Sequence, residues 1–150
     1  MNGLRELYRE VILDHNRHPR NFGELEGADR VVEGVNPLCG DRMTLYVKMD
    51  DETVRDIRFK GTGCAISVAS SSLMTERAKG GSVEELRALF EQVREMLTGE
   101  APGAVALESL DKLAALSGVR EYPTRVKCAT LAWHALNSAI AGSDEQVSTE

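Results

Sequence analysis

The chain has 150 residues, enough for one domain of ordinary size that buries its own core without disulfide bonds. It carries 18 Lys and Arg against 24 Asp and Glu, and the formal net charge of −6 argues against a nucleic-acid surface. Hydrophobic residues make up 42% of the chain, yet no window approaches the run of about 18 apolar residues that a membrane span needs. The first residues lack the apolar run of a secretory signal, so we expect a cytoplasmic protein with no nucleic-acid or membrane partner.

The N-terminal part of the sequence predicts one helix followed by three strands. Apolar residues at helical spacing indicate an amphipathic helix over residues 4–16, which should end before Pro19. Strict alternation of apolar and polar residues over 43–49 indicates a half-buried strand. We expect a strand at 31–35 before it and one at 54–59 after it, the last with a β-bulge because its apolar spacing slips by one residue. The short connections favour an antiparallel meander.

From Cys64 onward the pattern is helical almost to the C-terminus. The first expected helix covers 65–79 and ends at Gly80 and Gly81. The second is opened by a capping box of Ser82 and Glu85 and is broken at Gly99, Pro102 and Gly103. A short helix around 110–116 ends at Gly118, and a last helix covers 124–141. One helix, three strands and then a run of helices packed on one face of the sheet predict an α+β fold. We expect a single domain over residues 1–142 and a polar, frayed tail over 143–150.

The three cysteines are the most informative residues. An odd, small number of cysteines in an intracellular chain argues against a disulfide framework. Cys39, Cys64 and Cys128 all lie at element junctions, a placement less typical of inert core thiols, although Cys128 fits that role best. Cys64 and Cys128 are expected at or near helix starts, where free backbone N–H groups stabilise a thiolate. The residues alone leave open inert thiols, metal ligands and a reactive thiol.

If three thiolates share one metal, a tetrahedral zinc still lacks a ligand. Asp41 is the best candidate because it lies two residues after Cys39 and carboxylate is an accepted zinc ligand, although an aspartate in a turn commonly bonds its own backbone. The histidines are weaker candidates. His134 shares a helix face with polar residues and is expected to face solvent, whereas His15 and His18 end the first helix and are expected to cap it.

Arg125 lies three residues before Cys128 and is expected either to be a solvated cation or to pair with Asp41 when that carboxylate leaves the metal. The cysteine spacings match no zinc ribbon or finger. A catalytic zinc hydrolase is disfavoured, because four protein ligands would close the site to water and no glutamate lies near these motifs as a general base.

Three segments carry a resemblance to a known family: residues 36–43, 61–72 and 125–131. They resemble the three cysteine motifs of the IscU/NifU-N-terminal family of iron–sulfur cluster assembly proteins. The segment from Tyr8 to Asn21 resembles the opening helix and extended arm of that family, so the resemblance covers nearly the whole chain. It implies an α+β fold of the SufE/NifU type, with an N-terminal helix, a three-stranded antiparallel sheet and helices on one face.

Two departures from the scaffold branch of this family imply membership of the SufU-type branch. The scaffold branch has a histidine directly before its last cysteine, where this chain has Lys127. It also has a Leu-Pro-Pro-Val-Lys chaperone-docking motif, which residues 121–127 do not match. The longer stretch between Cys64 and Cys128 agrees with the same branch, whose members resemble zinc-dependent sulfur-transfer partners of a cysteine desulfurase. The missing motif argues against delivery by an Hsp70-type chaperone.

The resemblance implies a role for each candidate residue. The zinc ligands would be Cys39, Asp41, Cys64 and Cys128. Cys39 would accept persulfide sulfur from the desulfurase, and Arg125 would take Asp41 when the coordination changes. The sulfur would then pass to downstream cluster-assembly machinery, so the chain would act as a sulfurtransferase-type relay or a scaffold and not as a conventional turnover enzyme.

Two alternatives stay open. The chain could be a scaffold on which a transient [2Fe–2S] cluster is assembled from iron and sulfur, because cysteine thiolates suit iron and zinc alike, with Asp41 as a weak ligand that keeps the cluster labile. From a different class, it could be a structural zinc-binding module whose metal only holds the loops together.

Overall fold

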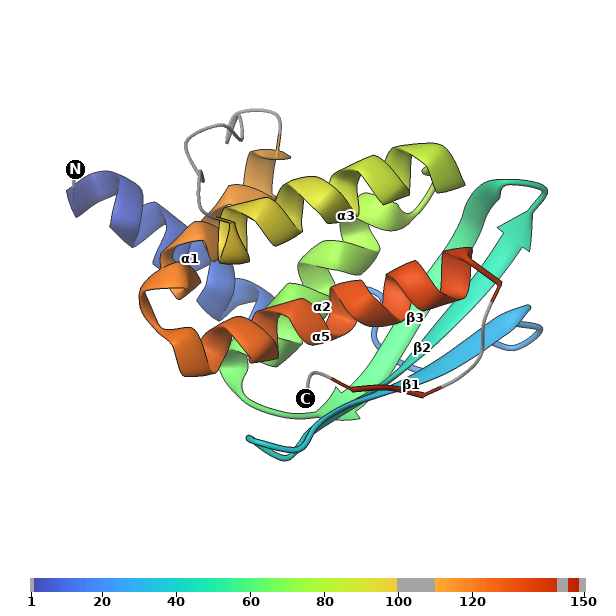
Figure 1. Cartoon of the computed structure of the whole chain (residues 1–150), viewed down its shortest axis with the longest axis horizontal. Coiled ribbons are helices and arrows are strands. Elements are labelled where there is room, and N and C mark those ends of the chain that lie inside the picture. Colours follow the sequence, from blue (N-terminus) through green and yellow to red (C-terminus); the bar gives the residue numbers. More distant parts are fainter. Residues whose placement is uncertain (1, 100–109, 143–145, 149–150) are drawn as a thin grey trace.

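The computed structural model describes residues 2–99, 110–142 and 146–148, and it shows an α+β protein in which helices cover one face of a mixed sheet (Figure 1). In chain order the elements are α1 (Asn2–Arg17), β1 (Arg30–Asn36), β2 (Asp41–Asp50), β3 (Thr53–Thr62), α2 (Ala65–Ala78), α3 (Val83–Thr98), the 3₁₀-helix η2 (Asp111–Glu121), α5 (Pro123–Ile140) and β4 (Val147–Ser148). The predicted fold class, with an N-terminal helix before the sheet and a run of helices after it, is confirmed.

The first three strands form the predicted antiparallel meander. β1 pairs with β2, and β2 pairs with β3. The expected bulge is present: Lys48 pairs with Asp56 but Met49 pairs with Val54, so Arg55 is the extra residue on β3. The alternation over 43–49 is borne out as well, because Met43, Leu45 and Val47 are buried and the residues between them are not.

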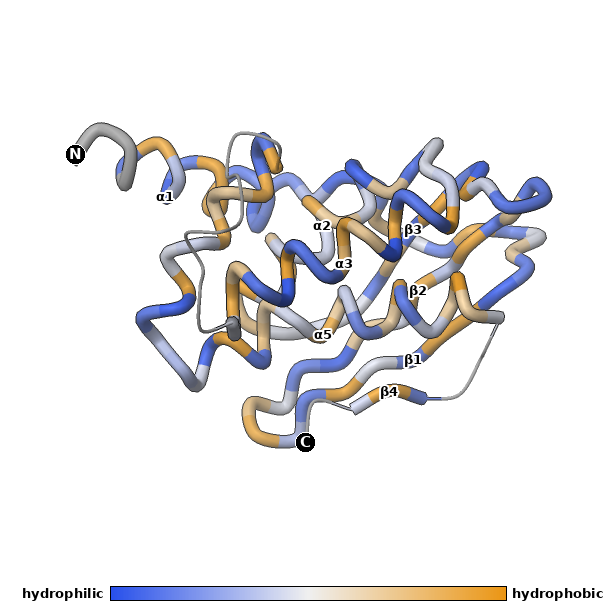
Figure 2. The backbone as a smooth tube through the Cα atoms, turned by 45° about the horizontal axis from the view of Figure 1, so that its top comes forward, coloured by the Kyte–Doolittle hydropathy of each residue, from blue (hydrophilic) through white to orange (hydrophobic). Residues whose placement is uncertain are grey.

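The sheet has four strands, so the prediction of three was wrong. β4 adds to the free edge of β1 in parallel, with Val147 opposite Gly34 and Ser148 opposite Val35, in strand order β3-β2-β1-β4 (Figure 2). These two residues belong to the segment that we expected to be a frayed tail. A pair of residues is too short to show an alternating pattern, and what places it is the unpaired edge of β1, which sequence spacing does not reveal.

The core lies between the sheet and the helices. α5 packs over β1 and β2, while α2 packs over β3 and against α5 (Figure 1). Trp133 on α5 is only 1% exposed, and its Nε1 donates to Ser70 Oγ on α2 at 3.2 Å. The Ser70 hydroxyl donates in turn to Ala129 O at 2.6 Å, so one small buried serine connects the two central helices. This packing fixes the starts of α2 and α5 relative to the sheet.

The predicted helix boundaries are mostly within one residue of those observed. Gly80 ends α2 with φ +86°, and Ser82 Oγ caps α3 by accepting from Glu85 N at 3.1 Å. The short helix differs, because it is a 3₁₀-helix that continues past Gly118 to Glu121. The predicted break at Pro102 and Gly103 lies outside the described residues. Across the described ranges, every helix is too short or too polar to cross a lipid bilayer.

Candidate metal centre

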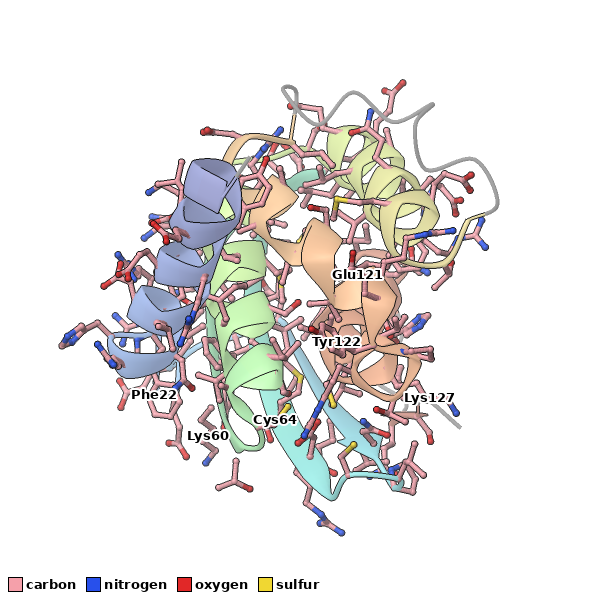
Figure 3. All side chains as sticks on the ribbon, turned by 90° about the vertical axis from the view of Figure 1, so that its left-hand side faces the viewer. Phe22, Lys60, Cys64, Glu121, Tyr122 and Lys127 are labelled. Atoms are coloured by element: carbon pink, nitrogen blue, oxygen red, sulfur yellow. The ribbon has the colours of Figure 1, made fainter. Side chains whose placement is uncertain are left out.

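Three segments that are far apart in the sequence meet at one end of the sheet: the β1–β2 turn, the β3–α2 turn and the first two turns of α5. Figure 3 looks at the molecule from this side and shows Cys64, Tyr122 and Lys127 toward the same end. Cys39 lies in the β1–β2 turn, where Asn36 O accepts from Cys39 N at 3.2 Å and from Gly40 N at 2.8 Å. Gly40 has φ +73°, a conformation that suits glycine and lets the chain reverse into β2.

Ligand atoms of Cys39, Asp41 and Cys128 lie within 4.8 Å of one another. Asp41 begins β2 and is 1% exposed, and its Oδ1 accepts from Cys64 N at 3.0 Å. Cys64 Sγ lies 3.9 Å from Asp41 Oδ2. The structure therefore brings Cys39, Asp41 and Cys128 into one compact group and places Cys64 directly beside the Asp41 carboxylate.

Gly63 allows this close approach. A Cβ atom on Gly63 would lie 2.7 Å from Asp41 Oδ1 and 3.2 Å from Ser67 Oγ, so a side chain there would push the Asp41 carboxylate out of its place. We expected the glycines beside Cys64 to let the backbone approach a bound ion; what the backbone meets at Gly63 is the carboxylate of Asp41. The missing side chain lets Cys64 N reach Asp41, and this contact orients the carboxylate.

The three thiols have different surroundings. Cys39 is exposed, Cys64 is half-buried and Cys128 is buried. Cys64 is the N-cap of α2, and its Sγ accepts from Ser67 N at 3.4 Å. Burial raises the pKa of the Cys128 thiol, and the neighbouring Asp41 carboxylate raises it further. A buried carboxylate among thiols favours either protonated sulfur or a bound cation.

The donor set fits zinc. With Zn–S bonds of about 2.3 Å, sulfurs in a tetrahedral site lie about 3.8 Å apart. Cys39 Sγ and Cys128 Sγ are 3.5 Å apart, which is well beyond a disulfide bond and close to that separation. Three thiolates and a carboxylate also suit iron. Cys39, Asp41 and Cys128 therefore suit either ion, with Cys64 beside Asp41 as the further candidate ligand.

Arg125 lies in the first turn of α5, beside the thiols. Hydrogen bonding and charge from Cys128 and Cys64 raise the pKa of the Arg125 guanidinium, which therefore remains a cation at this end of the sheet. Its pairing with Asp41 stays a prediction. Lys127, at the position where the scaffold branch has histidine, lines a groove of about 310 Å³ between α3 and α5 together with Phe90.

The histidines lie outside this group, but two of our expectations for them were wrong. His15 does not cap α1: it is 1% exposed and its Nδ1 lies 2.7 Å from Ser72 Oγ on α2. His134 does not face solvent freely: it is half-buried, its ring contacts Phe90 edge-on at 5.7 Å, and burial lowers its pKa. Both partners are distant in the sequence, so helical position alone could not indicate them.

Sequence reasoning missed two residues of the centre. Asn36 is 1% exposed and its Nδ2 donates to Cys128 Sγ at 3.6 Å, and Ser67 donates its backbone N–H to Cys64 Sγ. Asn36 opens the first cysteine motif, but a polar residue at the end of a strand normally indicates only a turn. The contact of its side chain with Cys128, 92 residues later, is seen only in the folded chain.

The fold and this group of residues define a class of small α+β domains that carry a thiol-rich candidate metal centre at one end of a sheet. Residues 7–129 match the family model described as the NifU-like N terminal domain. The chain belongs to the NifU-like N-terminal domain family.

Relatives of known name agree with this assignment. The chain is 43% identical over 143 residues to the iron–sulfur cluster assembly scaffold protein IscU of Streptococcus pyogenes serotype M1, covering 95% of this chain and 88% of that protein. It is 42% identical over 139 residues to the zinc-dependent sulfurtransferase SufU of Bacillus subtilis strain 168, covering 92% of each. A crystal structure described as an iron–sulfur cluster assembly scaffold for the SUF system of Fervidobacterium islandicum AW-1 superposes with a TM-score of 0.82 at 34% identity, covering 91% of this chain and 98% of that one.

Proposed function

We propose that this chain is an iron–sulfur cluster assembly protein that accepts persulfide sulfur from a cysteine desulfurase on Cys39, at a zinc site of three cysteines and one aspartate, and passes it on for cluster building. One observation carries the proposal: an exposed thiol, Cys39, lies within 4.8 Å of the buried ligand atoms of Asp41 and Cys128. The zinc-dependent sulfurtransferase of B. subtilis, 42% identical to this chain, supports it.

The residues that would hold zinc are Cys39, Asp41, Cys64 and Cys128. Bound zinc would keep these thiols deprotonated and protect them from oxidation. Asp41 is fixed by Cys64 N at 3.0 Å, and the absence of a side chain at Gly63 makes this contact possible. The carboxylate is thus oriented by the backbone before any ligand arrives.

Cys39 is the sulfur acceptor because its surroundings differ from those of the other two thiols. N–H groups of Ser67 and Asn36 reach Cys64 Sγ and Cys128 Sγ. In the part of the chain that the structure describes, no N–H group reaches Cys39 Sγ, and Cys39 is the exposed thiol of the three. A thiolate that is exposed and not stabilised by N–H donors is the better nucleophile and can meet a sulfur carried by another protein.

The transfer follows the chemistry of thiol–disulfide exchange. The Cys39 thiolate attacks the outer sulfur of the persulfide on the desulfurase, a new S–S bond forms at Cys39, and the bond between that sulfur and the partner's cysteine breaks. The partner's cysteine leaves as a thiolate and later takes a proton from solvent, so no external oxidant or reductant is needed. The Arg125 cation beside the thiols favours the anionic form of the reacting sulfurs.

Two exposed apolar side chains offer contact area for the desulfurase at this end of the molecule. Leu38, next to Cys39, is 65% exposed, and Tyr122, which precedes α5, is 61% exposed. Large apolar side chains that are this exposed beside a reactive group are common at protein–protein contacts. They lie on two of the segments that carry the centre and offer apolar contact area to a protein partner.

The test is sulfur acceptance by a Cys39→Ser variant. Purified protein is mixed with the desulfurase and cysteine, and persulfide on each cysteine is read by alkylation and mass spectrometry. We expect the wild type and an outer-face control on β2, Thr44→Ser, to carry persulfide on Cys39, and Cys39→Ser to carry none while keeping its thermal unfolding temperature in the metal-free form. Undiminished sulfur acceptance by Cys39→Ser would overturn the proposal.

A second candidate function is a scaffold on which a [2Fe–2S] cluster is built as cargo. The 43% identical relative from S. pyogenes is named an iron–sulfur cluster assembly scaffold protein, and the same donors suit iron. Anaerobic reconstitution with iron and sulfide, followed by visible absorption and transfer of the cluster to an acceptor apoprotein, separates the two functions. A stable visible spectrum and efficient transfer would favour the scaffold; their absence, with sulfur acceptance intact, favours the relay.

A further inference from the structure

Asn36 is a buried polar residue that connects the separate parts of the candidate metal centre. It ends β1 and pairs across the ladder with Asp41. Its carbonyl oxygen accepts from Cys39 N and Gly40 N and so closes the turn that carries Cys39. Its side chain, in a residue that is 1% exposed, points to Cys128, which lies on a different element. One residue thus contacts the segments that carry three of the four proposed ligands.

The two polar atoms of the Asn36 side-chain amide differ in their hydrogen bonds. Nδ2 donates to Cys128 Sγ at 3.6 Å, whereas Oδ1 is buried and has no hydrogen-bond partner among the residues that the structure describes. A buried carbonyl oxygen without a partner lowers the stability of the folded chain, because it loses its hydrogen bonds to water and gains none in the protein. A residue that only filled this space would be better apolar, so the N–H donor is the feature of Asn36 that explains its presence.

We propose that Asn36 is a positioning residue for Cys128: its N–H···S hydrogen bond holds the Cys128 sulfur in the centre as a metal ligand. This inference rests on the proposed metal-binding function of the same site. The amide donor stabilises negative charge on Cys128 Sγ, and Asn36 also fixes the turn that carries Cys39. Cys128 is therefore the retained sulfur, while Cys39, 3.5 Å away and without such a donor, is the sulfur that becomes available.

A donor to a ligating sulfur is a typical outer contact of a metal site, and the loss of such a contact usually costs 10–100-fold in metal affinity. Asn36→Leu removes the N–H donor, keeps the branching and the number of side-chain heavy atoms and also removes the unpartnered Oδ1. A positioning role then predicts opposite effects on two measurements. The metal-free protein should be at least as stable as the wild type, whereas its zinc affinity should fall roughly 10–100-fold.

Zinc affinity is measured by competition with a chromophoric chelator, and stability by thermal unfolding of the metal-free full chain. The matched control is Glu33→Ala, an exposed position on the same strand, which should leave both values unchanged. Cobalt replaces zinc in a second measurement, where the sulfur-to-cobalt charge-transfer band should shift in Asn36→Leu and not in Glu33→Ala. Wild-type zinc affinity together with an unshifted cobalt band in Asn36→Leu would overturn the inference.

If leucine at position 36 disturbs the fold, Asn36→Asp provides the test of the inference. This variant keeps the shape of the side chain and replaces the N–H donor with an acceptor that repels the Cys128 thiolate. We expect it to lose more zinc affinity than Asn36→Leu does; wild-type affinity in Asn36→Asp would overturn the inference. Failure of the proposed function is recognised separately. Sulfur acceptance by Cys39→Ser would refute the relay whatever the Asn36 variants do, and normal zinc binding in the Asn36 variants would leave the relay intact.

Discussion

Two partly buried polar clusters lie along α2, and they differ in how completely their hydrogen bonds are satisfied. The first, the arm cluster, joins the end of α1 and the segment after it to the middle of α2. Its members are His15, Arg20, Asn21, Ser72 and Thr75. Ser72 Oγ accepts from Arg20 N at 2.8 Å and lies 2.7 Å from His15 Nδ1, to which its hydroxyl can donate. Asn21 Nδ2 donates to Thr75 Oγ1 at 3.2 Å, so donors alternate with acceptors throughout.

The candidate metal centre at the start of α2 has an excess of acceptors. A buried carboxylate and three thiols meet there, and the N–H groups that reach them come from the backbone of Cys64 and Ser67, the Asn36 amide and the Arg125 guanidinium. Asn36 Oδ1 is left without a partner in the described part of the chain. A cluster whose hydrogen bonds are complete needs nothing from outside and acts on stability alone. A cluster rich in buried acceptors needs a cation, and this is the physical difference between a structural site and a binding site.

Metal removal should separate the two clusters most strongly. With free zinc 1,000-fold above its dissociation constant, bound zinc would add about 4 kcal/mol to the free energy of unfolding. At roughly 2–4 °C per kcal/mol, chelation should lower the unfolding temperature by roughly 8–16 °C. Calorimetry with and without chelator measures this. Asp41→Asn keeps the shape of the side chain but removes a ligand charge, and it should lose most of the zinc-dependent rise.

The control for that loss is Asp51→Asn. Asp51 is exposed in the β2–β3 turn with φ +55°, a conformation that asparagine adopts easily, so this variant should keep the whole rise. An equal zinc-dependent rise in both variants would mean that Asp41 is no ligand. Zinc would then be held by the thiols without the Asp41 carboxylate, whereas a wild type with no zinc-dependent rise would resemble the arm cluster in being purely structural.

Breaking the arm cluster should have a smaller effect that does not depend on metal. Ser72→Ala leaves His15 Nδ1 and Arg20 N–H without their shared partner in a buried setting, which should lower the free energy of unfolding by about 2–3 kcal/mol. Urea unfolding of the metal-free protein measures this, and zinc affinity should stay at the wild-type value. Ser138→Ala, on α5, should change stability by less than about 0.5 kcal/mol. A drop in zinc affinity in Ser72→Ala would show that the two clusters are coupled.

The sequence was sufficient for features that depend on neighbouring residues. The alternation over 43–49, the bulge on β3 and the cap at Ser82 are local patterns, and each appears in the structure. β4 depends on the free edge of a strand more than 100 residues earlier, and no local pattern of two residues can indicate it. The antiparallel meander was therefore predictable and the fourth strand was not.

The two polar clusters show the same division. The cysteine motifs could be recognised because each has its own glycines or helix start nearby, although their meeting at one point depends on packing among β1, α2 and α5. His15 and Asn36 were missed for a common reason. Their partners, Ser72 and Cys128, are 57 and 92 residues away, so only the folded chain shows that a terminal histidine is buried and that a turn asparagine reaches a sulfur.

The smallest expected effect is a dependence of stability on pH that comes from the arm cluster. Burial lowers the pKa of His15, with Arg20 adding to the effect. The unfolded chain, with a histidine pKa of about 6.5, therefore takes up a proton before the folded chain does as the pH falls. Stability should be fully present above about pH 6.5 and decrease below it, by at most about 1.4 kcal/mol per pH unit for each such histidine.

His134, whose pKa is also lowered by burial, contributes in the same direction, so His15→Gln should reduce the slope between pH 7.5 and 5.5 without abolishing it. The lowered pKa values of Asp14 and Asp56 start from 3.8 and act only at lower pH. Urea unfolding of the metal-free protein at the two pH values gives the slope and keeps zinc binding out of it. An unchanged slope in His15→Gln would mean that the His15 ring is protonated as readily in the folded chain as in the unfolded one. Burial would then not keep the His15 ring neutral, and the arm cluster would carry its positive charge at mildly acidic pH. The complete set of hydrogen bonds between neutral groups, which distinguishes the arm cluster from the metal centre, would then be refuted.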